Sequence, residues 1–141
     1  GDAAARATFD GLGTALTPVR TPIGDAWILA RDEQAFREPP GPTAGARLLP
    51  SGDAYYLFWG AGRELLVPDA AQRAELWTTR VWPGAVLVAG EIVGTWRRAR
   101  AEVSIQSWRR LTRAEGDAVE AEAASLPLPG VESEMVVHWK G

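Results

Sequence analysis

The sequence predicts an α+β fold: a small antiparallel β-barrel with short helices, preceded by a helix and a wing-like hairpin. Short apolar runs bounded by glycine, proline and aspartate fill most of the chain after residue 47, as in antiparallel strands joined by turns. Helical spacing of apolar residues is confined to a few brief stretches. A proline- and glycine-rich segment, residues 37–46, suits neither regular structure, so it predicts a linker between domains 1–36 and 47–141.

The first domain is predicted to contain a helix followed by a hairpin. Residues 2–16 carry apolar side chains at the spacing of one helical face, behind an aspartate in a capping position. Two strands, 17–21 and 26–30, then flank a turn at residues 22–25 that contains proline, glycine and aspartate. This is the order of a helix and its wing.

Residues 47–77 are predicted to form two strands and a helix. A turn at residues 50–53 leads into a strand at 54–59, whose two faces are both apolar, as in a strand buried inside a barrel. A second strand is expected at ELLVP, residues 64–68, and a short helix at 69–77.

Three strands are predicted next, at residues 85–89, 91–98 and 102–108. Ala89–Gly90 separates the first two, and glycine can supply the positive φ of a tight hairpin turn. Alternation along the second strand places Trp96 on the apolar face with Ile92 and Gly94, and Arg97 on the opposite face.

The end of the chain is predicted to contain an acidic helix and a last strand. The helix covers residues 112–125 and begins at Thr112, with Glu115 three residues later, which is the pattern of a capping box. Residues 131–140 alternate between apolar and polar side chains and predict the strand that closes the barrel.

The composition excludes several kinds of chemistry. The chain has no cysteine and one histidine, His138, so it has no disulfide or zinc–cysteine site and too few parts for a histidine-based triad or metal site. Nothing in the spacing pairs Asp53 with Glu91 as catalytic carboxylates. No apolar run approaches the ~18 residues of a membrane span, and the expected location is cytoplasmic.

Positive charge is concentrated in one stretch of an otherwise acidic chain. The formal net charge is -3, yet residues 91–113 hold six basic and two acidic side chains, a net +4. Arg97, Arg98 and Arg100 come at the end of a predicted strand, where rigid guanidinium groups could bind phosphate. The alternative is a solvated hairpin end, or one paired with Glu102.

The seven tryptophans allow both a structural and a binding role. Trp59, Trp96 and Trp139 lie in apolar alternation and are predicted to be core residues. Trp77 and Trp82 flank a loop, and for these two the sequence does not distinguish a buried core position from an exposed position that could contact a ligand. Arg109, Arg110 and Arg113 could extend the basic stretch or neutralise the acidic helix that begins beside them, and the second is expected.

Three blocks of sequence resemble one protein family. They are LTPVRTPIGDAWILARDE (16–33), RLLPSGDAYYLFWG (47–60) and RVWPGAVLVAGEIVGTWRRA (80–99). These blocks resemble the C-terminal part of the bacterial winged-helix DNA-binding proteins related to the crosslink-unhooking DNA glycosylases (AlkZ-like). The resemblance implies a last wing followed by a β-barrel, with further winged-helix units before them in the parent protein.

The resemblance also implies a role in DNA binding and DNA repair. The family's catalytic glutamine-x-glutamine motif is not formed by Gln34, Gln72 or Gln106, so no catalytic residue, metal or cofactor is expected in this chain. Arg20 and Thr21 lie near the wing turn, where a winged helix would contact DNA; the alternative is a wing used only for packing, since Asp25 adds a repelling charge. The leading hypothesis is a non-catalytic DNA-binding module that contacts duplex DNA and the N-terminal winged-helix units of its parent. The alternative is a scaffold or protein-interaction domain that contacts no DNA.

Overall fold

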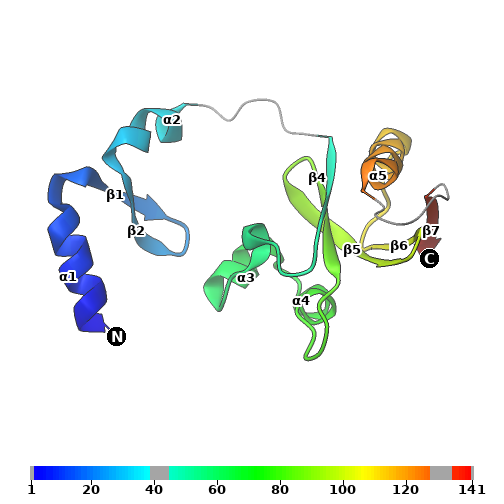
Figure 1. The fold of residues 1–141 in the computed structure, drawn as a ribbon, viewed down its shortest axis with the longest axis horizontal. Helices are drawn as coiled ribbons and strands as arrows, with labels where there is room; N and C mark the ends of the chain where they lie inside the picture. The colour runs from blue at the N-terminus through cyan, green and yellow to red at the C-terminus, as the bar shows by residue number, and fades with distance from the viewer. Residues whose placement is uncertain (1, 39–44, 128–134, 141) are drawn as a thin grey trace. The chain divides into compact units, whose positions relative to one another are not determined.

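The computed structural model describes residues 2–38, 45–127 and 135–140, and the chain divides into two compact units, residues 1–41 and 42–141. Figure 1 shows the elements of each unit. Most of the expected linker and the start of the expected last strand, residues 39–44 and 131–134, lie outside the described residues.

The first unit is a helix followed by a two-stranded hairpin and a second short helix. Its elements are α1 (Asp2–Leu12), η1 (Gly13–Ala15), β1 (Leu16–Thr21), β2 (Gly24–Leu29), η2 (Ala30–Asp32) and α2 (Glu33–Arg37). The order agrees with the sequence prediction. None of the described residues 2–38 is buried, and the apolar side chains of Phe9, Trp27 and Phe36 are about half exposed.

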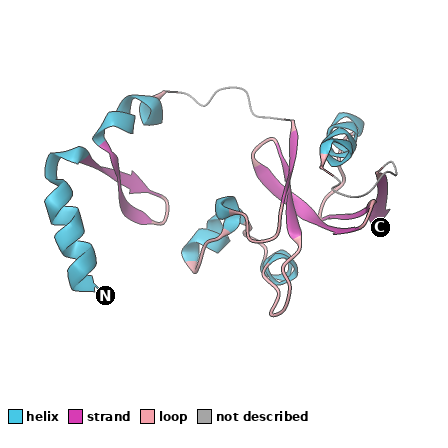
Figure 2. Ribbon diagram, in the orientation of Figure 1, coloured by secondary structure: helices cyan, strands magenta, loops and turns pink. Residues whose placement is uncertain are grey.

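The second unit is built on a five-stranded sheet (Figure 2). Its strands are β3 (Ala46–Leu49), β4 (Gly84–Val88), β5 (Glu91–Ala99), β6 (Glu102–Ser107) and β7 (Val136–Lys140), in the spatial order β3-β4-β5-β6-β7. The expected strands near 85–89, 91–98 and 102–108 are confirmed. Among the described residues β3 and β7 are not paired, so the predicted β-barrel is not confirmed.

One strand pair departs from the predicted antiparallel arrangement. β7 runs parallel to β6, whereas the other three pairs of the sheet are antiparallel. Between β6 and β7 the chain passes through α5 (Arg113–Ser125), and a crossover of this kind is what a parallel pair needs. The Thr112–Glu115 capping box at the start of α5 is confirmed in full.

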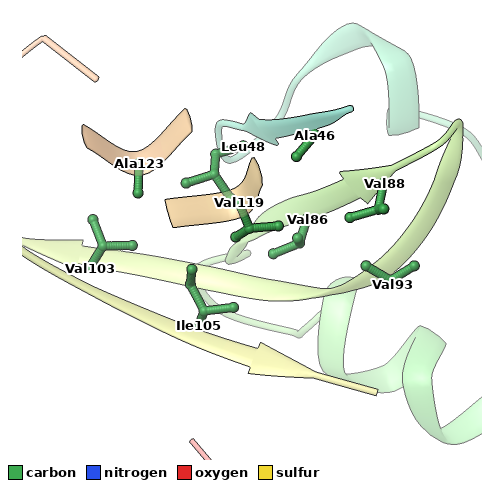
Figure 3. Packing of buried hydrophobic residues seen from close by; sticks show 9 residues of the cluster. All are labelled: Ala46, Leu48, Val86, Val88, Val93, Val103, Ile105, Val119 and Ala123. Carbon is green, nitrogen blue, oxygen red and sulfur yellow. The ribbon is translucent and has the colours of Figure 1, made fainter. Parts of the chain in front are cut away.

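The two faces of the sheet carry separate apolar clusters. On one face, α5 contributes Val119 and Ala123, which pack on side chains from β3 to β6 (Figure 3). On the other, Tyr56 and Leu76 pack with Ala85 and Ile92. Burial on both faces explains why β4 has an almost continuous apolar sequence.

The segment between β3 and β4 differs from the prediction. The expected strands at 54–59 and 64–68 are wrong: these residues hold a 3-10 turn, η3 (Ala54–Tyr56), and a helix, α3 (Ala61–Leu66). The Asp53 carboxylate accepts a hydrogen bond from the Tyr55 backbone N–H, and Gly60 adopts a positive φ of 53°. Capping and a turn therefore replace extended pairing here. The helix expected at 69–77 is confirmed as α4 (Ala70–Leu76).

A bulge shifts the facing of β5. Val86 pairs with Gly94 but Leu87 pairs with Ile92, so Val93 is an extra residue in β5. Its carbonyl accepts a hydrogen bond from the Trp108 backbone N–H at 2.9 Å. Ile92 therefore belongs to the Tyr56 cluster and not to the face of Trp96, where strict alternation had placed it.

None of the described helices combines the length and the apolar composition needed to cross a membrane.

Candidate functional site

The three clustered arginines lie at the end of the β5–β6 hairpin. Arg97 and Arg98 are in the last part of β5, opposite Ser104 and Val103, and Arg100 is in the turn. All three are exposed, and Arg100 has a left-handed backbone with a φ of 57°. Arg97 and Arg98 are consecutive in the strand, so their side chains leave the backbone on opposite sides.

Backbone carbonyl groups hold two of these guanidinium groups. Arg97 donates from Nη2 to the Val81 oxygen at 2.8 Å, and Arg98 donates from Nη1 to the Pro127 oxygen at 3.0 Å. A guanidinium has five N–H donors, so one such bond orients the group and leaves capacity for an anion. No described carboxylate forms an ion pair with Arg97, Arg98 or Arg100, so the expected alternative partner Glu102 does not pair with them.

Arg97 and Arg98 also border an open pocket of about 240 Å³. Its lining residues come from the turn after β3, the loop before β4 and the end of β5: Pro50, Ser51, Trp82, Pro83, Gly84, Trp96, Arg97 and Arg98. The pocket therefore places two permanent cations beside two indole rings. Arg100 does not line it.

Tyr56 fixes two walls of this pocket. Its side chain is fully buried, and its hydroxyl lies 2.6 Å from the Pro50 oxygen and 3.1 Å from the Pro83 oxygen. The same hydroxyl accepts a hydrogen bond from the Gly52 backbone N–H. Burial raises the pKa of Tyr56, so the phenol remains a neutral donor.

The floor of the pocket depends on close packing at Gly84. The Trp96 indole N–H donates to the Leu49 oxygen at 2.8 Å, and a Cβ on Gly84 would overlap both of these groups. Trp96 is half-buried and packs against the α5 cluster, in agreement with its predicted core role.

The sequence reasoning was wrong for two tryptophans. Trp59 is 78% exposed and Trp139 is 39% exposed, although both were predicted to be core residues. The expectation for Trp59 assumed a buried strand at 54–59, and that strand is absent from the described structure. Trp139 lies in β7 at the edge of the described sheet, with its indole N–H bonded to Glu120.

Arg63 is a residue that sequence reasoning missed. Its guanidinium carbon lies over three indole rings, 4.6 Å from the centroid of Trp59, 4.9 Å from Trp77 and 5.3 Å from Trp82. Its Nε donates to the Phe58 oxygen at 2.5 Å. Trp59 and Arg63 are four residues apart around the start of α3, and this spacing could have indicated from the sequence that their side chains are in contact.

Two of the three arginines expected to neutralise α5, Arg109 and Arg113, lie beside its carboxylates, whereas Arg110 forms no ion pair among the described residues. Arg109 forms a two-pronged ion pair with Glu115, with N–O distances of 2.7 and 3.1 Å. These hydrogen bonds, with that of the Thr112 N–H, hold the pKa of Glu115 down to about 2, and the same contact raises the pKa of Arg109. Arg113 lies 4.0 Å from Asp117.

The predicted wing residues occupy the β1–β2 hairpin of the first unit. Arg20 lies 4.0 Å from Asp25 with both side chains about nine-tenths exposed. The Thr21 hydroxyl donates to the Gly24 oxygen at 2.7 Å and accepts from the Ile23 N–H, so it organises the turn.

Comparisons with known proteins bear on the family. No curated protein matches the chain. The solved structure of the Streptomyces sahachiroi DNA glycosylase AlkZ resembles it with a TM-score of 0.70 at 24% sequence identity, over 94% of this chain and 35% of that chain. This chain thus spans about a third of the length of that protein. The family model described as DNA glycosylase AlkZ-like matches residues 2–127. The resemblance seen in the sequence is therefore confirmed, and the chain belongs to the AlkZ-like DNA glycosylase family.

Proposed function

We propose that this chain is a DNA-binding module of an AlkZ-like DNA-repair protein, non-catalytic by itself, that contacts the duplex backbone through Arg97, Arg98 and Arg100. The observation that carries the proposal is the placement of Arg97 and Arg98. Both are on the border of one open pocket, and backbone carbonyls orient both side chains. Guanidinium groups held in this way suit phosphate, which accepts hydrogen bonds from planar donor pairs.

The proposed domains and partners of the chain are based on its membership of the AlkZ-like family. Residues 1–36 would be the end of a winged-helix unit, with Arg20 and Thr21 on its wing, and residues 47–141 the barrel-like domain. The partners would be duplex DNA and the N-terminal winged-helix units of the same cytoplasmic parent. Catalysis would belong to that parent, and the chain alone should release no base from alkylated duplex.

Binding through phosphates has a recognisable thermodynamic signature. It should be weak and independent of base sequence, with a Kd of ~10⁻⁴–10⁻⁶ M at physiological salt, and it should weaken steeply as salt rises. The test is a salt titration of duplex binding by fluorescence anisotropy, for the parent chain and for the triple variant Arg97→Ala, Arg98→Ala, Arg100→Ala. Each lost phosphate contact should lower the salt slope by roughly one.

A second candidate is a protein-interaction domain without DNA contact. The segment around α3 favours it, because Leu57, Phe58 and Leu65 are each at least 43% exposed, and exposed apolar patches mark interaction sites. No duplex binding by either protein in the titration would support this candidate and contradict the first.

A further inference from the structure

Trp59 is the most exposed large apolar side chain among the described residues, at 78%. Tryptophan is usually well buried, because its indole offers more apolar surface than any other side chain. The exposed indole of Trp59 is therefore available to a ligand, and a flat ring stacked on it would remove the largest apolar area from water.

The ring of Trp59 is held in place from one side. The Arg63 guanidinium lies over it, and this cation is itself fixed by its bond to the Phe58 carbonyl and by the rings of Trp77 and Trp82. Those two rings are anchored in turn, since the Trp77 N–H donates to the Tyr56 oxygen at 3.1 Å and the Trp82 N–H donates to the Thr78 oxygen at 2.9 Å.

One nitrogen of the Arg63 guanidinium is closed to solvent. The Arg63 Nη2 atom is buried and has no hydrogen-bond partner in the described structure, so ring faces are what compensate its charge. An anion therefore has no access to this nitrogen. The surface that the stack offers outward is the indole of Trp59.

The stack adjoins the arginine site. Trp82 contacts Arg63 and also lines the pocket bordered by Arg97 and Arg98. A ligand that reached both features would need a flat ring next to an anion, and a nucleotide has both. An apolar protein segment could cover Trp59 but would gain nothing from the neighbouring guanidinium groups.

We propose that Trp59, braced by Arg63, is a stacking platform for an unpaired nucleobase of DNA. This inference rests on the proposed function and deepens it: the arginines would hold phosphates, while Trp59 would favour DNA in which a base is out of the duplex stack. Stacking on an aromatic ring tolerates every base, because each has a π-face.

The test compares two fluorescent DNA probes by anisotropy, a fully paired duplex and the same duplex with one bulged base. Trp59→Leu should weaken binding of the bulged probe at least about five-fold, the equivalent of about 1 kcal/mol, and should change binding of the paired duplex little. Trp59→Phe keeps an aromatic face and should recover much of the loss. Leu65→Gln is the matched control, since Leu65 is also exposed in α3 but has no ring, and it should bind both probes like the parent chain.

A second readout needs no variant to fold. A bulged 2-aminopurine should lose fluorescence when the parent chain binds, because stacking on indole quenches it. Unchanged emission on binding, equal affinities of the parent and Trp59→Leu for the bulged probe, or no DNA binding at all would each overturn the inference. An equal loss of bulged-probe binding in Leu65→Gln would also overturn it, because leucine offers no ring on which a base could stack. Because the Arg97, Arg98 and Arg100 triple variant should weaken both probes equally, failure of the phosphate contact is distinguishable from failure of the stacking platform.

Discussion

At the scale of single residues, Tyr56 links the core to the candidate site. One hydroxyl touches the carbonyls of Pro50 and Pro83 and the N–H of Gly52, so it holds together two loops that are far apart in sequence. The same loops carry Ser51 and Trp82 at the pocket. The shape of the site therefore depends on a buried hydrogen-bonding group and not only on its exposed arginines.

Replacing Tyr56 by phenylalanine should lower the free energy of unfolding by about 1–3 kcal/mol, because it leaves buried polar backbone groups without their partner. Tyr55→Phe is the matched control. The Tyr55 hydroxyl donates a hydrogen bond to the Gly90 oxygen at 3.2 Å at an exposed position. Removing this hydroxyl should therefore lower the free energy of unfolding by no more than about 0.5 kcal/mol. Urea denaturation measures both, and equal losses would contradict the central role of Tyr56.

Glu115 should make stability depend on pH in the acidic range. Its pKa is lowered to about 2 in the folded protein by hydrogen bonds from Arg109 and the Thr112 backbone, against an ordinary value of 4.5 that the unfolded chain keeps. The carboxylate therefore stabilises the fold fully above about pH 4.5, and this contribution is lost as the pH falls from there towards about 2.

The Glu115→Gln variant isolates this effect from other carboxyl groups. Glutamine can still complete the capping box but cannot form the ion pair with Arg109. The difference in melting temperature between parent and variant should shrink between about pH 6 and about pH 3. A difference that stays constant over that range would contradict the assignment.

At the scale of elements, the β4–β5–β6 meander needs glycine at one crossing. A Cβ on Gly94 would overlap the Gln106 carbonyl oxygen and approach the Ser107 Cα to 3.0 Å, so the β6 backbone would have to move. Gly94 follows the bulged Val93, where β5 changes its facing. Glycine at this position thus allows the backbones of β5 and β6 to lie close together, next to the point where β5 contributes Val93 to one cluster and Ile92 to the other.

Gly94→Ala should destabilise the protein by about 1–3 kcal/mol through overpacking. Gly116→Ala makes the same chemical change within α5, where the added methyl would meet nothing within 4 Å, and it should stabilise the protein by up to about 1 kcal/mol. Thermal melts of the two variants should therefore move in opposite directions. Shifts of the same sign would contradict this account of the sheet.

Local signals in the sequence predicted the regular hairpins and α5 well. The Ala89–Gly90 turn and the Thr112–Glu115 capping box each depend only on residues a few positions apart, so the sequence alone predicts them. The bulge at Val93 was not predictable, because it depends on the Trp108 N–H from another strand end. The segment 54–66 was misassigned because runs of apolar residues look alike in a buried strand and in an exposed turn with a short helix.

The candidate site was predictable only in part. The charge pattern picked out Arg97, Arg98 and Arg100, since three guanidinium groups within four positions stand out in an acidic chain. The pocket beside them was not predictable, because its walls come from segments more than 30 residues apart that Tyr56 connects. The stack of Arg63 required the same three-dimensional information.

At the scale of the whole molecule, the two units differ in their means of stability. The second unit has two buried clusters, whereas none of the described residues 2–38 is buried. A segment of fewer than about 40 residues rarely folds alone without disulfides or metals, and the chain has no cysteine.

Hydrogen exchange should therefore separate the two units. In the isolated chain, amides of β1 and β2 should exchange on the order of a hundredfold faster than those of β4 and β5, because local opening of the first unit exposes little apolar surface. Mass spectrometry of peptides from each unit measures this. Equal protection in both units would show that the first unit is stabilised by contacts outside its described residues.

The most direct test of the DNA-binding proposal is a salt titration of duplex binding with a charge-matched control. One variant replaces Arg97, Arg98 and Arg100 with glutamine, and the control replaces Arg110, Arg113 and Lys140, which are also exposed and lie in the same unit. Both lose three positive charges, so any effect of net charge alone is shared. We predict that the first variant binds more weakly than the control and has a salt slope lower by up to about three, while the control keeps the slope of the parent chain. Equal affinities and slopes for the two variants would contradict the proposal that these three arginines are the DNA contact.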